Sequence, residues 1–514
     1  MDNLKGLERG GVRLQSLLLD KRLVTELASD FSLPDYQPEI KRLLGVRAVV
    51  TPADKYIGAG SGELSGSVEY SILYSGNDGE LYCSGQVSEY RFTVPLELPS
   101  DFEIAQGLIC DVDTVAETPA ARVTGPRRLC VKCRLRSRVR LFGTRWIEEM
   151  LIGAEDGELE RLLGSFESMQ TFSGSSDALH LGDEILNDGG EELRVISAEG
   201  QAYVNEAIAG SGCVNCRGEV VLKLLCARVE TNGAMPFVQW RRIPFTGTVP
   251  TEGAEVNCMA SARGTCTDVT VTVEDGRILC EVSLRLQSRA MRNVTVPYTK
   301  DVYLTGGKGE VRHAPLVYQT VGKCTGGNFS LNTTLSLEEA GLRRGQTVAD
   351  LSLTPTVTTL ENDGGRLVLH GKCRCLCLVR SEDEFSAQEF ELPFRYIADG
   401  TAEPHTDCDV DVTVISCRAR EDGERMSIDA ELSVSIVTRG EGSVEMLAEG
   451  VFKDGSKTEE EGYTVCFPSA SDTLWSIGKR YCVPVARLSE GNPLSGSPVA
   501  DAADSLAGMK YLLI

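Results

Sequence analysis

Apolar and polar residues alternate over long stretches of this chain. Three clear examples are SGSVEYSILY from Ser65, RGEVVLKLLC from Arg217 and HGKCRCLCLV from His370. A two-residue period is typical of a β-strand that buries one face. Turn sequences of the Asn-Asp-Gly and Glu-Asp-Gly type separate such runs, as tight hairpins require. The pattern therefore predicts a mainly β protein with antiparallel strands.

The alternating runs occur in three copies. Gly66, Gly218 and Gly371 occupy the same place in each run and are evenly spaced along the chain. A later phrase also recurs, as YRF at 90–92, IPF at 243–245 and LPF at 392–394. We expect three repeated antiparallel β domains, each with strands enough for two packed layers or a curled sheet. Their predicted bounds are 1–150, 151–310 and 311–440.

The last part of the chain has a different pattern. Residues 441–461 are rich in Gly and Glu and predict an acidic, solvated linker. Residues 462–514 predict a small α+β unit in the order strand, helix, helix, strand. Asp472 or Thr473 can cap the first helix, on which Leu474, Ile477 and Tyr481 share one face. The short strand signal before it is YTV at 463–465.

This terminal unit resembles a LysM domain. The resemblance lies in DTLWSI at 472–477, the KRY that follows, Val485 and Asn492. Such domains bind macromolecules and do no chemistry, so the resemblance implies a docking role. It implies contacts through exposed or loop residues, supported by a core of Leu474, Ile477 and Tyr481. The implied contact residues are Asp472, Thr473, Trp475, Lys479, Arg480 and Asn492.

Charge and segment composition exclude several classes of partner. The formal net charge of the 514 residues is −23, which would repel nucleic acid and anionic membranes. The first residues hold only a short leucine run broken by charges, so we expect neither a secretory signal nor membrane insertion. The sequence therefore predicts a cytoplasmic protein that binds no nucleic acid.

The 18 cysteines do not predict disulfides or a metal site. Cytosolic thiols stay reduced, and the CVKC pair Cys130 and Cys133 lies on opposite faces of a predicted strand. Cys373, Cys375 and Cys377 share a face but occupy repeat positions that hold apolar residues in the other copies, so we expect them in the core. The four histidines are scattered and no catalytic motif is present. We expect no metal, no cofactor and no enzymatic activity.

One basic strand stands out in this acidic chain. Alternation places five basic residues on one face of this strand, opposite a mostly apolar face: Lys132, Arg134, Arg136, Arg138 and Arg140. Such a ridge can hold an acidic partner surface or phosphate. The pattern more often indicates a solvated face paired with neighbouring acids, and we favour that interpretation.

Taken together, the three β copies and the terminal unit resemble the SipL-like spore-coat morphogenesis proteins of clostridia, whose body is built of SPOCS domains. The phrase LPDYQPEIKRLLGV at 33–46, followed by the ILY strand, carries the resemblance in the first copy. It implies a non-enzymatic scaffold of the mother cell, in which the LysM domain docks onto the coat morphogenetic ATPase at the forespore surface. The alternative is a cell-wall or cortex-associated protein whose LysM domain binds the N-acetylglucosamine glycan of peptidoglycan.

Overall fold

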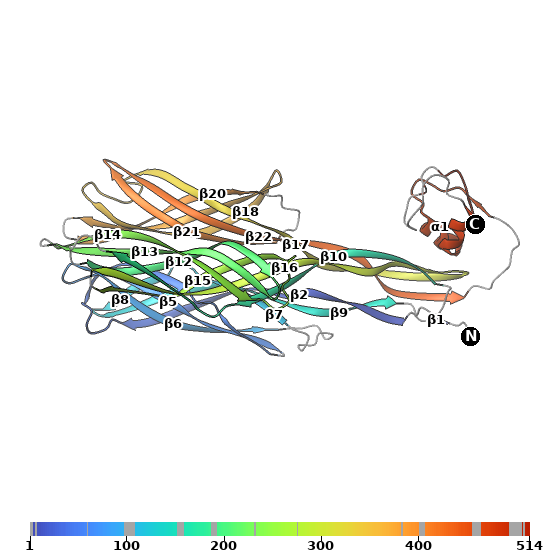
Figure 1. Ribbon diagram of the computed structural model, residues 1–514, viewed down its shortest axis with the longest axis horizontal. Coiled ribbons are helices and arrows are strands. Elements are labelled where there is room, and N and C mark those ends of the chain that lie inside the picture. The colour runs from blue at the N-terminus through green and yellow to red at the C-terminus, as the bar shows by residue number, and fades with distance from the viewer. Residues whose placement is uncertain are drawn as a thin grey trace.

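The computed structural model describes residues 4–5, 8–58, 60–96, 108–151, 159–186, 193–230, 233–274, 276–381, 384–399, 407–454, 464–492, 506 and 509–514. Within these ranges the chain forms seven sheets and two short helices. The predicted mainly β class is therefore confirmed. Figure 1 shows a wide body of sheets, from which long strands continue as a narrow stalk towards a small C-terminal unit.

Three stretches of the chain, here called segments 1, 2 and 3, build the body and the stalk. Segment 1 comprises β2 (Glu8–Ser32), β3 (Ile40–Val50), β4 (Asp54–Ile57), β5 (Ser61–Gly76), β6 (Leu81–Pro95), β7 (Leu108–Ala116), β8 (Ala120–Gly125) and β9 (Arg128–Leu151). Segment 2 comprises β10 (Leu159–Ser175), β11 (Leu179–Leu186), β12 (Leu193–Gly210), β13 (Cys213–Glu230), β14 (Gly233–Pro250), β15 (Met259–Glu274) and β16 (Arg277–Leu304). Segment 3 comprises β17 (Gly307–Ser336), β18 (Thr347–Asp363), β19 (Arg366–Ser381), β20 (Glu384–Ala398), β21 (Asp407–Asp422) and β22 (Arg425–Asp454). The short β1 (Leu4–Lys5) pairs with β22.

Each segment folds as two antiparallel sheets with the same strand order. The middle strands form one sheet around β5, β13 or β19, and the opening and closing strands form the other around β9, β16 or β22. In every segment the two central strands face each other across one apolar core. In segment 1, for example, Val68 and Tyr70 of β5 pack with Leu129 and Val131 of β9. Alternate residues on each strand thus supply the core, as the two-residue period predicts.

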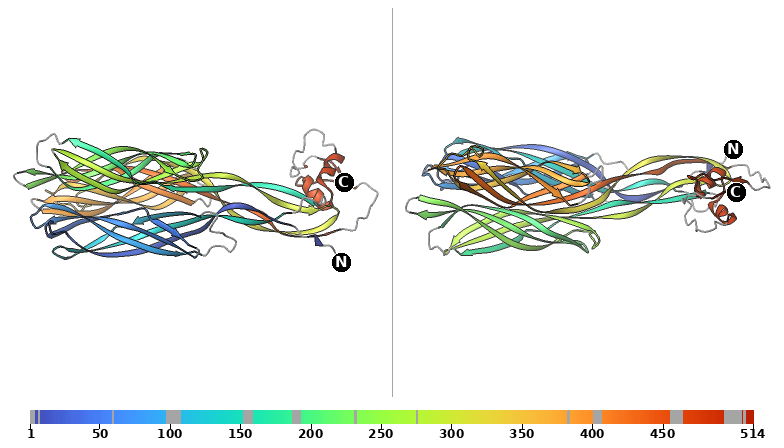
Figure 2. Two further views of the ribbon diagram at one scale, coloured as in Figure 1. Left: turned by 60° about the horizontal axis from the view of Figure 1, so that its bottom comes forward. Right: turned by 90° about the horizontal axis from the view of Figure 1, so that it is seen from above.

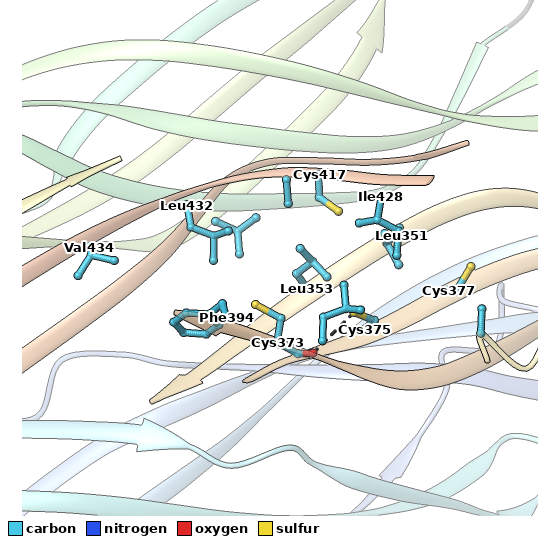
Figure 3. Close-up of a cluster of buried hydrophobic side chains, with 14 of the residues drawn as sticks. Leu351, Leu353, Cys373, Cys375, Cys377, Phe394, Cys417, Ile428, Leu432 and Val434 are labelled. Carbon is cyan, nitrogen blue, oxygen red and sulfur yellow. Dashed lines mark hydrogen bonds between the residues drawn. The ribbon is translucent and has the colours of Figure 1, made fainter. Parts of the chain in front are cut away.

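The cysteines of β19 lie in the core of segment 3. Cys373, Cys375 and Cys377 are fully buried beside Phe394 and Ile428 (Figure 3). Burial raises the pKa of Cys373 and Cys377 to about 12, because a thiolate is poorly solvated there. All 18 cysteines are free thiols. The prediction that the β19 cysteines are core residues is confirmed.

A glycine faces an aromatic ring at the same place in each segment. Gly66 is paired with Tyr90, Gly218 with Phe245 and Gly371 with Phe394. A side chain on any of the three glycines would collide with that ring. An aromatic ring that covers a strand glycine protects its bare backbone. The structure also corrects the sequence alignment, because Tyr90, and not a residue two positions later, is equivalent to Phe245 and Phe394.

Glycine-rich hairpin turns join neighbouring strands at corresponding places in the three segments. Gly212 joins β12 to β13 with a φ of 71°, and Gly364 and Gly365 join β18 to β19 with φ of 58° and 87°. Two consecutive residues with positive φ are characteristic of the tightest hairpin turns. Gly58 donates its backbone N–H to the carbonyl of Ser61 at the corresponding turn of segment 1.

The three segments pack side by side around a common interior (Figure 2). At the far end of the body, one apolar cluster joins Leu44, Leu225 and Leu378, one residue from each segment. In the stalk, the ring of Phe166 lies 4.4 Å from that of Tyr318, measured between centroids, and joins Leu14 and Met446 in a second three-segment cluster. The stalk is therefore held together by side-chain packing between the ends of the β2–β9, β10–β16 and β17–β22 pairs.

Two of the predicted domain bounds are wrong. β17 begins at Gly307, so residues 307–310 belong to segment 3. β22 continues to Asp454, so residues 441–454 are strand and not acidic linker. Their glycines and glutamates mislead because only the inward residues of a two-stranded ribbon need to be apolar; Met446 and Phe452 are two of these and are buried. Residues 455–461, the rest of the predicted linker, lie outside the described residues.

Candidate functional site

The C-terminal unit has the predicted order of strand, helix, helix and strand. β23 (Val465–Cys466) pairs with β24 (Leu512–Leu513), and α1 (Leu474–Tyr481) and α2 (Val485–Gly491) lie between them. Thr473 caps α1 in a capping box: its hydroxyl accepts the backbone N–H of Ser476, whose own hydroxyl accepts the backbone N–H of Thr473. Helix α1 ends at Cys482, which has a left-handed φ of 54°.

Three of the predicted contact residues hold this unit together. Asp472 accepts hydrogen bonds from the backbone N–H of Ser469 at 2.9 Å and from Arg480 at 2.7 Å, and these donors lower the pKa of its carboxyl group. Asn492 fixes the end of α2 to the second strand, with its amide donating to the carbonyls of Leu488 and Leu513. Asp472 and Asn492 are buried, so together with the cap Thr473 they stabilise the unit's own fold.

Trp475 and Lys479 face the tip of the stalk. The indole Nε1 of Trp475 donates to Oδ2 of Asp301 at 2.9 Å, and Nζ of Lys479 donates to both Asp301 oxygens at 2.7 Å. The ring of Tyr303 meets the Trp475 indole edge to face, 4.8 Å between centroids. Burial alone would raise the pKa of Asp301, but the hydrogen bonds from Lys479 and Trp475 bring it below its ordinary value.

Backbone contacts complete this interface. The hydroxyl of Tyr303 donates to the carbonyl of Val483 at 2.8 Å, and the backbone N–H of Gly306 donates to the carbonyl of Cys482 at 2.8 Å. A side chain at Gly478 would collide with the Tyr303 hydroxyl. The close approach of α1 to the stalk thus requires glycine at this position. We call Trp475, Gly478 and Lys479 the docking face of α1.

The structure corrects two sequence-based expectations about α1. Trp475 was expected to be exposed, but the stalk covers it and leaves it 6% exposed. Tyr481 was expected in the core, but it is 39% exposed. Val483 and Val485, which follow the left-handed turn, pack on the core around Leu474 in its place.

The sequence reasoning missed the stalk residues of this interface. β16 carries a bulge at Lys300, since Leu162 pairs with Asp301 whereas the next residue of β10 pairs with Thr299. A bulge re-aims the side chains that follow it, and here it precedes Asp301 and Tyr303. The signal in the sequence was the charged residue Asp301 within the otherwise strand-like YTKDVYL at 298–304, which could have indicated a polar contact there.

The predicted basic ridge leads to a second polar region, where the three segments meet. Arg134 and Arg136 are paired with Glu117 near the surface, as the favoured interpretation expects. Arg140 does not follow it, because its side chain is only 3% exposed. We call the group of ion pairs around it the charged junction, which consists of Arg138, Arg140, Arg289, Arg439, Asp20, Asp111, Asp407 and Asp409.

Asp409 of segment 3 is the centre of the charged junction. Arg140 of segment 1 donates two hydrogen bonds to it at 2.7 and 2.8 Å, Arg289 of segment 2 donates one at 2.5 Å, and Arg439 donates one at 2.9 Å. Burial alone would raise the pKa of Asp409, but these arginines hold it far below its ordinary value, and the same holds for Asp111 beside Arg289 and Arg140. The junction therefore ties all three segments together through charge-assisted hydrogen bonds.

Neither region has the arrangement of a metal centre. Among the described residues, no three His, Cys, Asp or Glu side chains come together in a way that could hold a metal ion. In the same residues, no helix has the length and apolar character needed to cross a bilayer. No protein-family model, curated protein or solved structure matches this chain.

Proposed function

We propose that this protein is a non-enzymatic scaffold in the assembly of the bacterial spore envelope. In this proposal it works in the mother-cell cytoplasm at the forespore surface. Its three segments are SPOCS-like repeats, which their common strand order and their shared glycine–aromatic pair support. Its C-terminal unit is a LysM-like module that docks onto the coat morphogenetic ATPase.

The position of the C-terminal unit supports a docking role. The long strand pairs carry it to the end of the stalk, away from the body of the molecule (Figures 1 and 2). The unit has a small core of its own, built around Leu474, Ile477, Leu488 and Leu512. A module at the end of a packed stalk can reach a partner surface that the broad body would not approach.

The observation that carries the choice of a protein partner is the contact of α1 with Asp301 and Tyr303. The docking face already holds a protein segment through a carboxylate and an aromatic ring. Trp and Tyr side chains are enriched among the residues that contribute most to binding at protein interfaces. The chemistry of this face therefore favours a protein ligand over a glycan.

A second candidate function, binding of peptidoglycan, is supported by a different surface. Phe467, in the loop after β23, is 76% exposed, and Tyr511, just before β24, is 56% exposed. The LysM resemblance implies a glycan groove at these two connections. Exposed aromatic rings beside polar groups are suited to ligands such as sugars, which have both apolar faces and hydrated polar groups.

The two functions can be separated with the purified full chain. We expect the ATPase to be retained on immobilised protein. In a chain that also carries Asp301→Asn, so that the internal carboxylate no longer competes for Lys479, we expect Lys479→Met to weaken that binding about 30-fold, as loss of a hot-spot residue worth about 2 kcal/mol would. Lys510→Met is the matched control, because Lys510 lies on the exposed surface of the same unit, and it should bind as the parent does. Sedimentation with purified peptidoglycan tests the alternative, for which Phe467→Ala should be the damaging change. Failure of the parent to bind the ATPase would refute the scaffold proposal.

A further inference from the structure

The stalk presents two side chains to the docking face from alternate positions of one strand. Asp301 and Tyr303 are two residues apart on β16, so both point to the same side of the strand. Asp301 is 18% exposed in its side chain and Tyr303 is buried. Asp301 accepts the hydrogen bonds of Lys479 and Trp475, and Tyr303 makes the ring contact with Trp475 and the hydrogen bond to the Val483 carbonyl.

The docking face is chemically matched to this pair. Trp475 and Lys479 are four residues apart on α1 and so lie on the same side of the helix. Both donate to one carboxylate, Lys479 to each of its oxygens. The Tyr303 ring then packs on the indole, and its hydroxyl finds an acceptor in the Val483 carbonyl.

We infer that the docking face recognises an extended strand that carries a carboxylate followed two residues later by an aromatic ring, and that the stalk strand Asp301-Val302-Tyr303 occupies this site within the molecule. The inference rests on the proposed function and names the partner chemistry of the same site. The partner's docking segment has this pattern, and it must displace the stalk to bind.

The internal contact is suited to displacement. The C-terminal unit has its own core and capping box, so it does not depend on Asp301 for its main apolar contacts. Among the residues that the structure describes, the contacts of this interface include one carboxylate, one ring and two hydrogen bonds to backbone carbonyls. A ligand tethered in the same chain acts at an effective concentration of the order of millimolar, so it competes well without a large interface.

The test uses the full chain and a labelled peptide with the stalk sequence TKDVYLT, residues 299–305. Fluorescence anisotropy measures its binding to the parent and to Asp301→Asn, a change of nearly equal size that removes the internal carboxylate. We expect Asp301→Asn to bind the peptide at least about 10-fold more tightly than the parent, since the internal competitor is weakened. Asp429→Asn is the matched control, because Asp429 is exposed on β22, and it should behave as the parent does.

Two further measurements make the result specific. A peptide with Asn in place of the Asp should bind Asp301→Asn at least about 10-fold more weakly than the original, because Lys479 then lacks its charged acceptor. Adding Lys479→Met to Asp301→Asn should remove the gain. Equal binding of the two peptides, or equal binding of the original peptide to the parent and Asp301→Asn, would overturn the inference. If these peptide results hold and the ATPase does not bind, the proposed function fails while the ligand chemistry stands.

Discussion

Replacement of Asp409 by Asn is a direct test of the charged junction. Asn has nearly the same size, so the change removes a negative charge without opening a cavity. Four arginines, with at least one from each segment, donate to this carboxylate: Arg138, Arg140, Arg289 and Arg439. The side-chain amide nitrogen of the introduced Asn would be a hydrogen-bond donor that faces the N–H donors of the arginines. The arginines would also lose one of the carboxylates that neutralise them.

The expected cost follows from the burial of the partners. Removal of one member of a buried ion pair costs about 3–5 kcal/mol. Asp409 retains 24% of its side-chain exposure, whereas Arg140 and Arg439 retain 3% and 2%. Because water reaches the carboxylate but hardly reaches two of its partners, we place the loss at the lower end, about 3 kcal/mol. Since 1.36 kcal/mol is a factor of ten, the equilibrium constant for unfolding should rise about 160-fold.

Urea unfolding followed by circular dichroism and by tryptophan fluorescence measures the loss. Asp429→Asn serves again as the control on β22 and should change the free energy of unfolding by less than about 0.5 kcal/mol. A double-mutant cycle with Arg289→Gln should recover at least about 1 kcal/mol of coupling, because the two residues are in direct contact. A loss below about 1 kcal/mol for Asp409→Asn, or no coupling, would refute the view that the junction holds the segments together.

Three further predictions use the same material. The pKa values of Asp409 and Asp111 are lower in the folded protein than in the unfolded chain. Their ionised forms therefore stabilise the fold above a pH of about 4, and this stabilisation is lost as the pH falls below that value. A urea unfolding midpoint that is the same at pH 6 and pH 3 would contradict this. Gly218→Ala should cost about 2 kcal/mol, because its Cβ would meet the Tyr203 carbonyl and the Phe245 ring, whereas Gly85→Ala, with open space around it, should be neutral or slightly stabilising in thermal melts. Brief treatment of the native protein with iodoacetamide, followed by peptide mapping, should find Cys324 labelled and the three β19 cysteines unlabelled. Cys324 is exposed, whereas the β19 cysteines are buried. Labelling of all four at equal rates would count against the assignment of the β19 cysteines to the core.

The fold of the segments could be predicted because alternation reports directly on burial. Val68, Tyr70, Ile72 and Tyr74 were expected on one face of a strand, and all four are buried. The same reasoning failed at residues 441–454, because a two-stranded ribbon buries only one narrow side and tolerates Gly and Glu elsewhere. Packing of three such ribbons into one stalk depends on contacts between segments, which no local pattern contains.

The candidate site was predictable only in part. The resemblance to a LysM domain implied contacts through Trp475 and Lys479, whereas their partner Asp301 is 174 residues away from Trp475 in the sequence. The same resemblance implied that Asp472 and Asn492 contact a partner, but they satisfy backbone groups inside the unit.

The charged junction explains how such a long stalk can hold its tip in a defined position. An apolar cluster of Phe142, Met169, Met291 and Val437 lies within two residues of the junction arginines on β9, β16 and β22. Apolar side chains tolerate sliding along a ribbon, but a shift by one residue would turn each arginine away from its carboxylate. Buried polar groups can fix register at some expense of stability. We therefore expect the junction to set the relative register of the three strand pairs, and thereby the place at which Asp301 meets α1. Loss of the junction in Asp409→Asn should consequently weaken the distant contact between Asp301 and Lys479 as well. The TKDVYLT peptide should then bind this variant more tightly than it binds the parent. Peptide binding equal to the parent's would show that the stalk keeps its register without the junction.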